Sequence, residues 1–190
     1  MMAANNKSLA SVYEGWDGYQ TSLLQAIRPL TGEQLAWRPS PNLRSVGELA
    51  RHIALGRITW FVRMDAPGSS ELADQITAWQ EDQHGNRYVI ESAIAITDRA
   101  SELVKWLEAS WHMIDQTLKA WTVDDLAKTY RHTWQGNTYA ISRQWTIWRI
   151  MSHDIHHGGE LVVMLGMQGL SNFELGDLGG HIIDPPLADQ

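Results

Sequence analysis

Two histidines in the last third of the sequence have the spacing of a metal-ligand pair. His153 and His157 lie in the stretch His153-Asp-Ile-His156-His157, inside a segment whose apolar pattern predicts a helix. Residues four apart on a helix lie on one face, one turn above the other, so both imidazoles can converge on a single ion. The competing interpretation is that they are packed or surface histidines with no ligand role.

A third histidine, His52, lies in a comparable apolar helical setting between Leu49 and Ile53. Buried imidazoles need polar partners, and a metal ion is one way to supply them. The chain has no cysteine, which excludes thiolate ligands and cysteine nucleophiles. We therefore predict a divalent-metal site on His52, His153 and His157, with a coordination position left for water, as in catalytic sites.

Two charged residues fall near the same helical face. Glu160 follows His157 by three positions and is a candidate catalytic general base or fourth ligand; the alternative is a carboxylate outside the ligand set or on the surface. Arg149 precedes His153 by four positions and is a candidate to bind an anionic substrate, since guanidinium suits carboxylates and phosphates. The alternative for Arg149 is an interhelical salt bridge.

Other residues receive simpler interpretations. Most of the ten tryptophans fall on helical stripes and are expected in the core, but Trp60, Trp145 or Trp148 are candidates to wall a substrate pocket above the metal. Glu48 has capping-box spacing from Ser45, so a local role is favoured for it. Asp154 is about 100° around the helix from His153, so the two cannot easily face one ion. Four of the other histidines are expected to be solvated or locally bonded: His84, His112, His132 and His181. His156 is rotated around the helix from His157 and is expected either to support a ligand or to lie at the subunit surface.

Four long amphipathic segments must position these residues. Apolar residues recur at three and four positions over about 7–28, 45–65, 91–120 and 142–166, and no comparable set of strands exists. Short extra helices are expected near 31–36 and 71–79, and 130–141 has the pattern of a small hairpin before the last helix. The sequence thus predicts an all-α four-helix bundle in a single domain over 1–190.

Composition and charge exclude several classes of protein. A hydrophobic content of 44% with 19% charged residues argues against intrinsic disorder. The net charge of −7 and the lack of a Lys/Arg run argue against a nucleic-acid partner. The apolar runs are too short to span a membrane, and Met1–Leu9 lacks the pattern of a signal peptide. We expect a cytoplasmic protein with a small-molecule substrate.

Two stretches carry a family resemblance. Leu30-Thr-Gly-Glu-Gln-Leu-Ala-Trp-Arg-Pro39, followed by Ser45-Val-Gly-Glu-Leu-Ala-Arg-His52-Ile53, resembles the entry to the second helix of DinB-like (YfiT-type) metalloproteins. Trp145-Thr-Ile-Trp-Arg-Ile-Met-Ser-His153-Asp-Ile-His-His157-Gly-Gly-Glu160 resembles the fourth helix of that family. The order His…His-x-x-x-His is the specific part of the resemblance.

The resemblance implies a bundle of up-down-down-up connectivity, a metal such as nickel or zinc on the three histidines, and a homodimer. Iron and manganese are the further metals to consider. It also implies a metal-dependent enzyme that transfers a low-molecular-weight thiol, such as bacillithiol, mycothiol or glutathione, to a small electrophile, or else a hydrolase. The alternative from another class is a non-catalytic metal- or ligand-binding bundle in a stress response.

Overall fold

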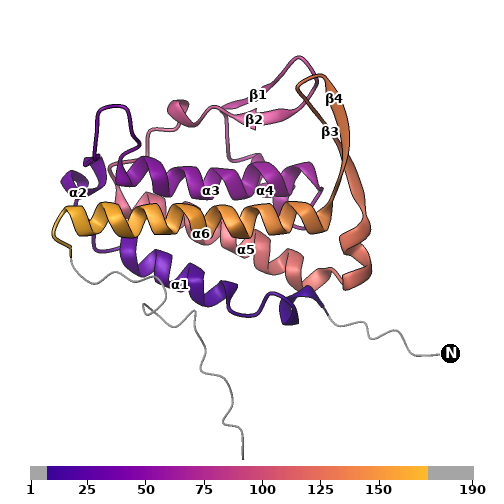
Figure 1. The fold of residues 1–190 in the computed structure, drawn as a ribbon, viewed down its shortest axis with the longest axis horizontal. Coiled ribbons are helices and arrows are strands. Elements are labelled where there is room, and N and C mark those ends of the chain that lie inside the picture. The colour runs from indigo at the N-terminus through magenta and orange to yellow at the C-terminus, as the bar shows by residue number, and fades with distance from the viewer. Residues whose placement is uncertain (1–7, 171–190) are drawn as a thin grey trace, which may run out of the picture.

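Four long helices dominate the computed structural model, which describes residues 8–170 (Figure 1). Between residues 8 and 170 no helix is both long and apolar enough to cross a bilayer. The elements, in chain order, are η1 Leu9–Ser11, α1 Trp16–Ile27, α2 Gly32–Ala36, α3 Val46–Arg63, α4 Ser69–Ala73, β1 Trp79–Glu81, β2 Arg87–Val89, η2 Glu91–Ala93, α5 Ala100–Ala120, η3 Val123–Ala127, β3 Thr129–Trp134, β4 Asn137–Ser142 and α6 Arg143–Met167.

The four long helices, α1, α3, α5 and α6, have up-down-down-up connectivity. Trp16 packs on Trp111 while Gln20 bonds Leu107, so α1 and α5 are antiparallel. α3 runs parallel to α5 and antiparallel to α6, as the ribbon shows (Figure 1). The predicted all-α bundle and its connectivity are confirmed, and α3 lies between α5 and α6 at the centre of the contacts.

Polar side chains begin the helices that enter this core. Ser45 and Glu48 form a reciprocal capping box at the start of α3, with the Glu48 backbone N–H donating to Ser45 Oγ at 3.2 Å and the Ser45 N–H donating to Glu48 Oε2 at 2.8 Å. Thr31 and Gln34 do the same for α2. These caps satisfy backbone donors that a helix start leaves unpaired. The local role predicted for Glu48 is therefore confirmed.

Two of the long helices begin later than their apolar stripes suggested. α1 starts at Trp16 rather than near residue 7, because Gly15 has a left-handed φ of 97° that breaks the helix. α5 starts at Ala100 rather than at 91. The stripe residue Ile96 is buried from a non-helical segment instead, where the Thr97 carbonyl passes so close to Gly47 that a Cβ there would collide with it.

Two hairpins cover one end of the bundle (Figure 1). The predicted hairpin before the last helix is β3–β4, turned at Gln135 and Gly136, both with positive φ. β1–β2 was not predicted; the short helix expected over 71–79 is instead α4 at Ser69–Ala73. Asn86 joins the hairpins, donating to the Thr133 carbonyl at 2.6 Å and accepting from the Thr133 N–H at 3.3 Å. The tail, with His181, lies outside the described residues.

Candidate metal centre

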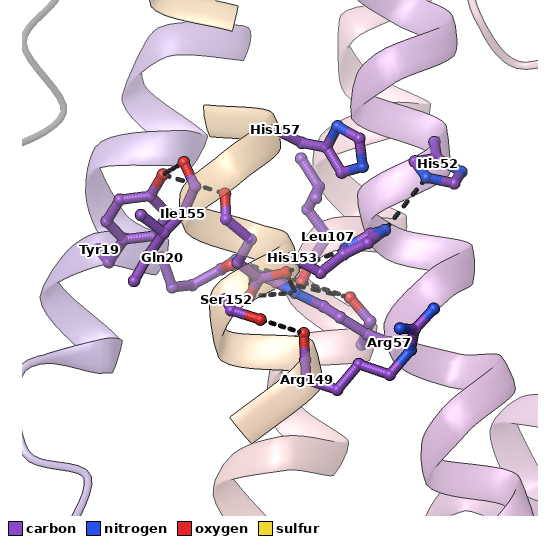
Figure 2. A network of polar contacts seen from close by, with 12 residues as sticks. Tyr19, Gln20, His52, Arg57, Leu107, Arg149, Ser152, His153, Ile155 and His157 are labelled. Carbon is purple, nitrogen blue, oxygen red and sulfur yellow. Dashed lines mark hydrogen bonds and ion pairs between the residues drawn. The ribbon is translucent and has the colours of Figure 1, made fainter. Parts of the chain in front are cut away.

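The three predicted histidines meet between α3 and α6. His52 comes from the middle of α3, and His153 and His157 come from successive turns of α6, which crosses it antiparallel. Their imidazoles are turned toward a common space (Figure 2). Nε2 of His153 lies 3.1 Å from Nε2 of His52, and one potential ligand nitrogen from each ring lies within 4.8 Å of the others.

Carboxylates lie behind two of the rings. Glu91 Oε1 lies 2.6 Å from Nδ1 of His52, and Glu160 Oε2 lies 2.7 Å from Nδ1 of His157. Because an ionised carboxylate only accepts hydrogen bonds, each Nδ1 carries a proton and each neutral ring keeps its Nε2 lone pair free. Histidines that bind metals are usually oriented by such a bond to the other nitrogen.

The third ring is held differently. Nδ1 of His153 is buried without a hydrogen-bond partner in the structure described, and it lies 3.9 Å from Asp154 Oδ1. Its Nε2 faces that of His52, and two facing nitrogens need a proton or a cation between them. The donor set therefore fits a divalent cation: a group of three imidazoles that can hold a metal.

The ionisation of the surrounding groups also favours a cation at this site. Burial lowers the pKa of His157, and this outweighs the bond to Glu160. Burial opposes the ionisation of Glu91 and Glu160, but the hydrogen bonds from His52 and His157 prevail and the pKa of each carboxyl is lowered. At neutral pH two carboxylates thus lie behind the rings of His52 and His157, and this negative charge attracts a cation.

A buried ion pair lies beside His153. Arg57 Nη2 lies 2.8 Å from Asp154 Oδ2, and both side chains are fully buried. Trp16 Nε1 donates to the same carboxylate at 3.0 Å, and Arg57 also donates to Gln20 at 2.7 Å. Arg57 keeps the pKa of the Asp154 carboxyl low despite its burial, which by itself raises that pKa. Asp154 therefore points into the core, and it ties α6 to α1 and α3.

The charged neighbours proposed from spacing occupy different places. Glu160 is engaged by His157, and its Oε1 lies 3.3 Å from Nε2 of the exposed His156. Its role as general base or fourth ligand stays a prediction; with His156 and His157 it forms a second group that could hold a metal ion. Arg149 makes no salt bridge within residues 8–170; its guanidinium lies 4.5 Å from the centre of the Trp60 ring.

Three of the candidate substrate-pocket residues, Trp60, Trp145 and Arg149, line a single cavity. It has a volume of about 650 Å³ and opens between α3, α6 and the β3–β4 hairpin; its wall includes Trp60, His132, Trp134, Tyr139, Trp145 and Arg149. His132, expected to be solvated or locally bonded, is half-buried against Trp60, with ring centres 5.5 Å apart. Trp148, one turn from Trp145, points outward and is 60% exposed.

Glu91, Arg57 and His132 are the site-region residues that spacing did not identify. Arg57 carried a usable signal, since it occupies a core position of α3 four residues after Ile53 and four before Phe61. A charged residue at such a position needs a buried partner. Glu91 and His132 carried no such signal in the sequence; they lie in η2 and β3, outside the long helices.

Comparisons with known proteins agree with this architecture. A family model described as the DinB superfamily matches residues 16–161. A DinB-like protein from Bacillus cereus ATCC 10987 has 14% identity and a TM-score of 0.60, with 86% of this chain and 95% of that one covered. A DinB-like protein from Bacillus subtilis has 16% identity and a TM-score of 0.51, with 85% and 93% covered. No curated protein matches the sequence.

Proposed function

The chain belongs to the DinB superfamily, and from that premise we propose that it is a divalent-metal-dependent enzyme in which His52, His153 and His157 hold the ion. The proposed reaction is transfer of a low-molecular-weight thiol to a small electrophile. The observation that carries the proposal is the convergence of three imidazoles, two of them backed by carboxylates on Nδ1, beside an aromatic pocket.

The residues of the chain have separable tasks in this proposal. Glu91 and Glu160 fix the tautomer and the ring orientation of His52 and His157. Glu160 thereby acts as a positioning residue, because its hydrogen-bonding oxygens face His156 and His157. Asp154 and Arg57 anchor the turn of α6 that presents His153.

A divalent ion on three neutral ligands keeps its full charge, which lowers the pKa of a coordinated water or thiol and polarises a carbonyl. The sequence contains no cysteine, so the thiol in this reaction must come from a small molecule. Imidazole ligands suit nickel and zinc, and we propose one of these two metals.

Two measurements test the proposal. Elemental analysis of protein purified without an affinity tag or chelator should show about one nickel or zinc per chain. The metal-loaded protein, mixed with a small thiol and an electrophile such as a maleate ester, should give a thioether product detectable by mass spectrometry. The His153→Ala variant should not form this thioether product. Loaded protein without turnover for any thiol would contradict the transferase assignment.

We also propose a homodimer, supported by exposed apolar side chains along α6. Trp148, Ile155, Val163 and Met167 are each more than half exposed, and their spacing of seven, eight and four residues keeps them near one helical face. Light scattering during size-exclusion chromatography should give twice the mass of one chain, and a mass equal to one chain would contradict the dimer.

A further inference from the structure

The aromatic pocket has the features of a binding site for a flat ligand. Trp60 lies 5.7 Å from Trp145 and 5.5 Å from His132 between ring centres, with interplanar angles of 56° and 58°. Tilted rings of this kind form a corner, and the Arg149 guanidinium lies beside both tryptophan rings there. At the mouth, Trp134 is 59% exposed and Tyr139 is 45% exposed. A planar apolar group at the mouth would bury this exposed aromatic surface.

The hairpin wall presents its aromatic residues by strand alternation. His132 pairs directly with Tyr139, and Trp134 pairs with Asn137, so His132, Trp134 and Tyr139 share the face toward the cavity. Arg131 lies on the opposite face of β3 and is exposed. The pocket therefore has one wall from helices α3 and α6 and another from the hairpin.

Within residues 8–170 the arginines at the pocket form no ion pair, although the Asp82 carboxylate lies near enough to act on Arg63 and His132. Arg149 lies 4.5 Å from Trp60 and 5.6 Å from Trp145, and Arg63 lies 4.4 Å from Trp60. Neither guanidinium forms a salt bridge in the described part of the chain, and Arg63 donates to the Arg87 carbonyl. Burial lowers the pKa of His132, and both arginines add to that effect against Asp82. The pocket wall thus combines the His132 imidazole with the Arg149 guanidinium, and Arg63 lies against the Trp60 ring.

Arg149 lies between this pocket and the histidines. It is one helical turn before His153 on α6, about 6 Å along the axis, and its side chain extends toward α3 below His153 (Figure 2). A planar guanidinium binds a carboxylate through two parallel hydrogen bonds. An anion bound by Arg149 would therefore lie at the boundary between the aromatic pocket and the metal centre.

We propose that the pocket binds an aromatic carboxylate, with the ring against Trp134 and Trp145 and the carboxylate on Arg149. This proposal rests on the proposed function, for which it names two recognition groups of the substrate, the ring and the carboxylate. The electrophilic carbon is that of a conjugated double bond, to which the thiol sulfur adds while the thiol proton ends on the neighbouring carbon. It gives Arg149 the role of substrate anchor and the two tryptophans the role of shape selection.

The test uses the full chain stripped of metal with chelator, so that pocket binding is measured apart from metal chemistry. Isothermal titration with 2-naphthoate should show one site, and the neutral 2-naphthamide should bind about tenfold more weakly or worse, the factor expected from losing a hydrogen bond to a charged group. Equal affinity for both would overturn the carboxylate assignment. Absence of 2-naphthoate binding would overturn the pocket proposal, whatever metal the protein holds.

Matched variants locate the site. Arg149→Gln should weaken 2-naphthoate binding about tenfold without affecting 2-naphthamide, and Arg149→Lys should fall between parent and Gln variant. Arg131→Gln, on the outer face of β3, should leave 2-naphthoate binding unchanged. Trp145→Ala should weaken both probes, whereas Trp148→Ala should weaken neither. Equal effects of the Arg149 and Arg131 variants, in proteins with parental circular dichroism, would overturn the assignment to this pocket.

Metal content separates the two proposals. If 2-naphthoate binds as described but elemental analysis finds no metal, the pocket stands and the proposed function fails. If metal is present and 2-naphthoate does not bind, the metal site stands and the aromatic-carboxylate assignment fails.

Discussion

Oε1 of Glu91 lies 2.6 Å from Nδ1 of His52, although the two residues are 39 positions apart in the sequence. Glu91 belongs to the short 3-10 helix η2, in the connection between β2 and α5. This connection therefore reaches the candidate metal centre. The orientation of His52 thus depends on a segment outside the bundle helices.

Glu91→Gln should reduce metal affinity by roughly tenfold to a hundredfold, the usual effect of removing a carboxylate partner from a ligand histidine. All three proposed ligands remain, so the fold and the stoichiometry should persist. Competition with a chromophoric chelator measures the affinity. Glu81→Gln, at an exposed carboxylate of β1, is the control and should match the parent. Parental affinity in the Glu91 variant would show that this contact does not support the site.

His52→Ala, His153→Ala and His157→Ala should each lower metal content after dialysis by more than the Glu91 variant does, because each removes a proposed ligand. Elemental analysis of the dialysed proteins provides the measurement, with the exposed His112→Ala as control. One full equivalent of metal in all three variants would rule out the three-histidine site.

Gly56→Ala should separate metal binding from stability. A Cβ at Gly56 would lie 2.9 Å from Cε1 of His153, so the imidazole must move. Because a ring at the end of a side chain can shift cheaply, the melting temperature should change little while metal affinity falls. Gly159→Ala is the control: nothing lies within 4 Å of its Cβ position, so it should gain about 0.5–1 kcal/mol in stability and keep its affinity. Unchanged affinity in Gly56→Ala would mean that His153 tolerates displacement.

Asp154→Asn should destabilise the protein by about 3–5 kcal/mol, because it leaves the fully buried Arg57 without a counter-charge. Urea unfolding followed by circular dichroism measures the loss. Replacing both partners with apolar residues, as in Arg57→Met with Asp154→Leu, should recover much of it. A single variant as stable as the parent would show that the ion pair makes no such contribution.

Metal affinity should fall as the pH drops below about 6.5, the ordinary pKa of free histidine, since a protonated imidazole cannot bind a cation. Burial lowers the pKa of His157, so this ring stays neutral to a lower pH than free histidine and its share of the loss should come later. Titrations from about pH 5.5 to pH 8 bracket that range. Constant affinity across it would count against histidine ligation.

Local sequence patterns predicted the helices and the histidine group, but not the contacts that support them. The His153–His157 spacing is a property of one helix, and capping at Ser45 is equally local. Glu91 could not be assigned to His52, because the apolar pattern placed it at the start of the long helix predicted over 91–120, whereas the contact depends on how the non-helical chain before α5 returns over α3. The late start of α5 has a similar cause, since Ile96 reaches the core without a helix.

The two walls of the aromatic pocket differ in how freely they can change. The helical wall shares α3 and α6 with the histidines and the Arg57–Asp154 pair, so substitutions there disturb several functions at once. The β3–β4 wall is linked to the neighbouring hairpin through Asn86 and carries none of the proposed ligands. Mutation and selection can therefore change the lining of this pocket through residues 129–142 while the histidine group stays intact, which makes the hairpin the natural starting point for redesigning the proposed ligand specificity.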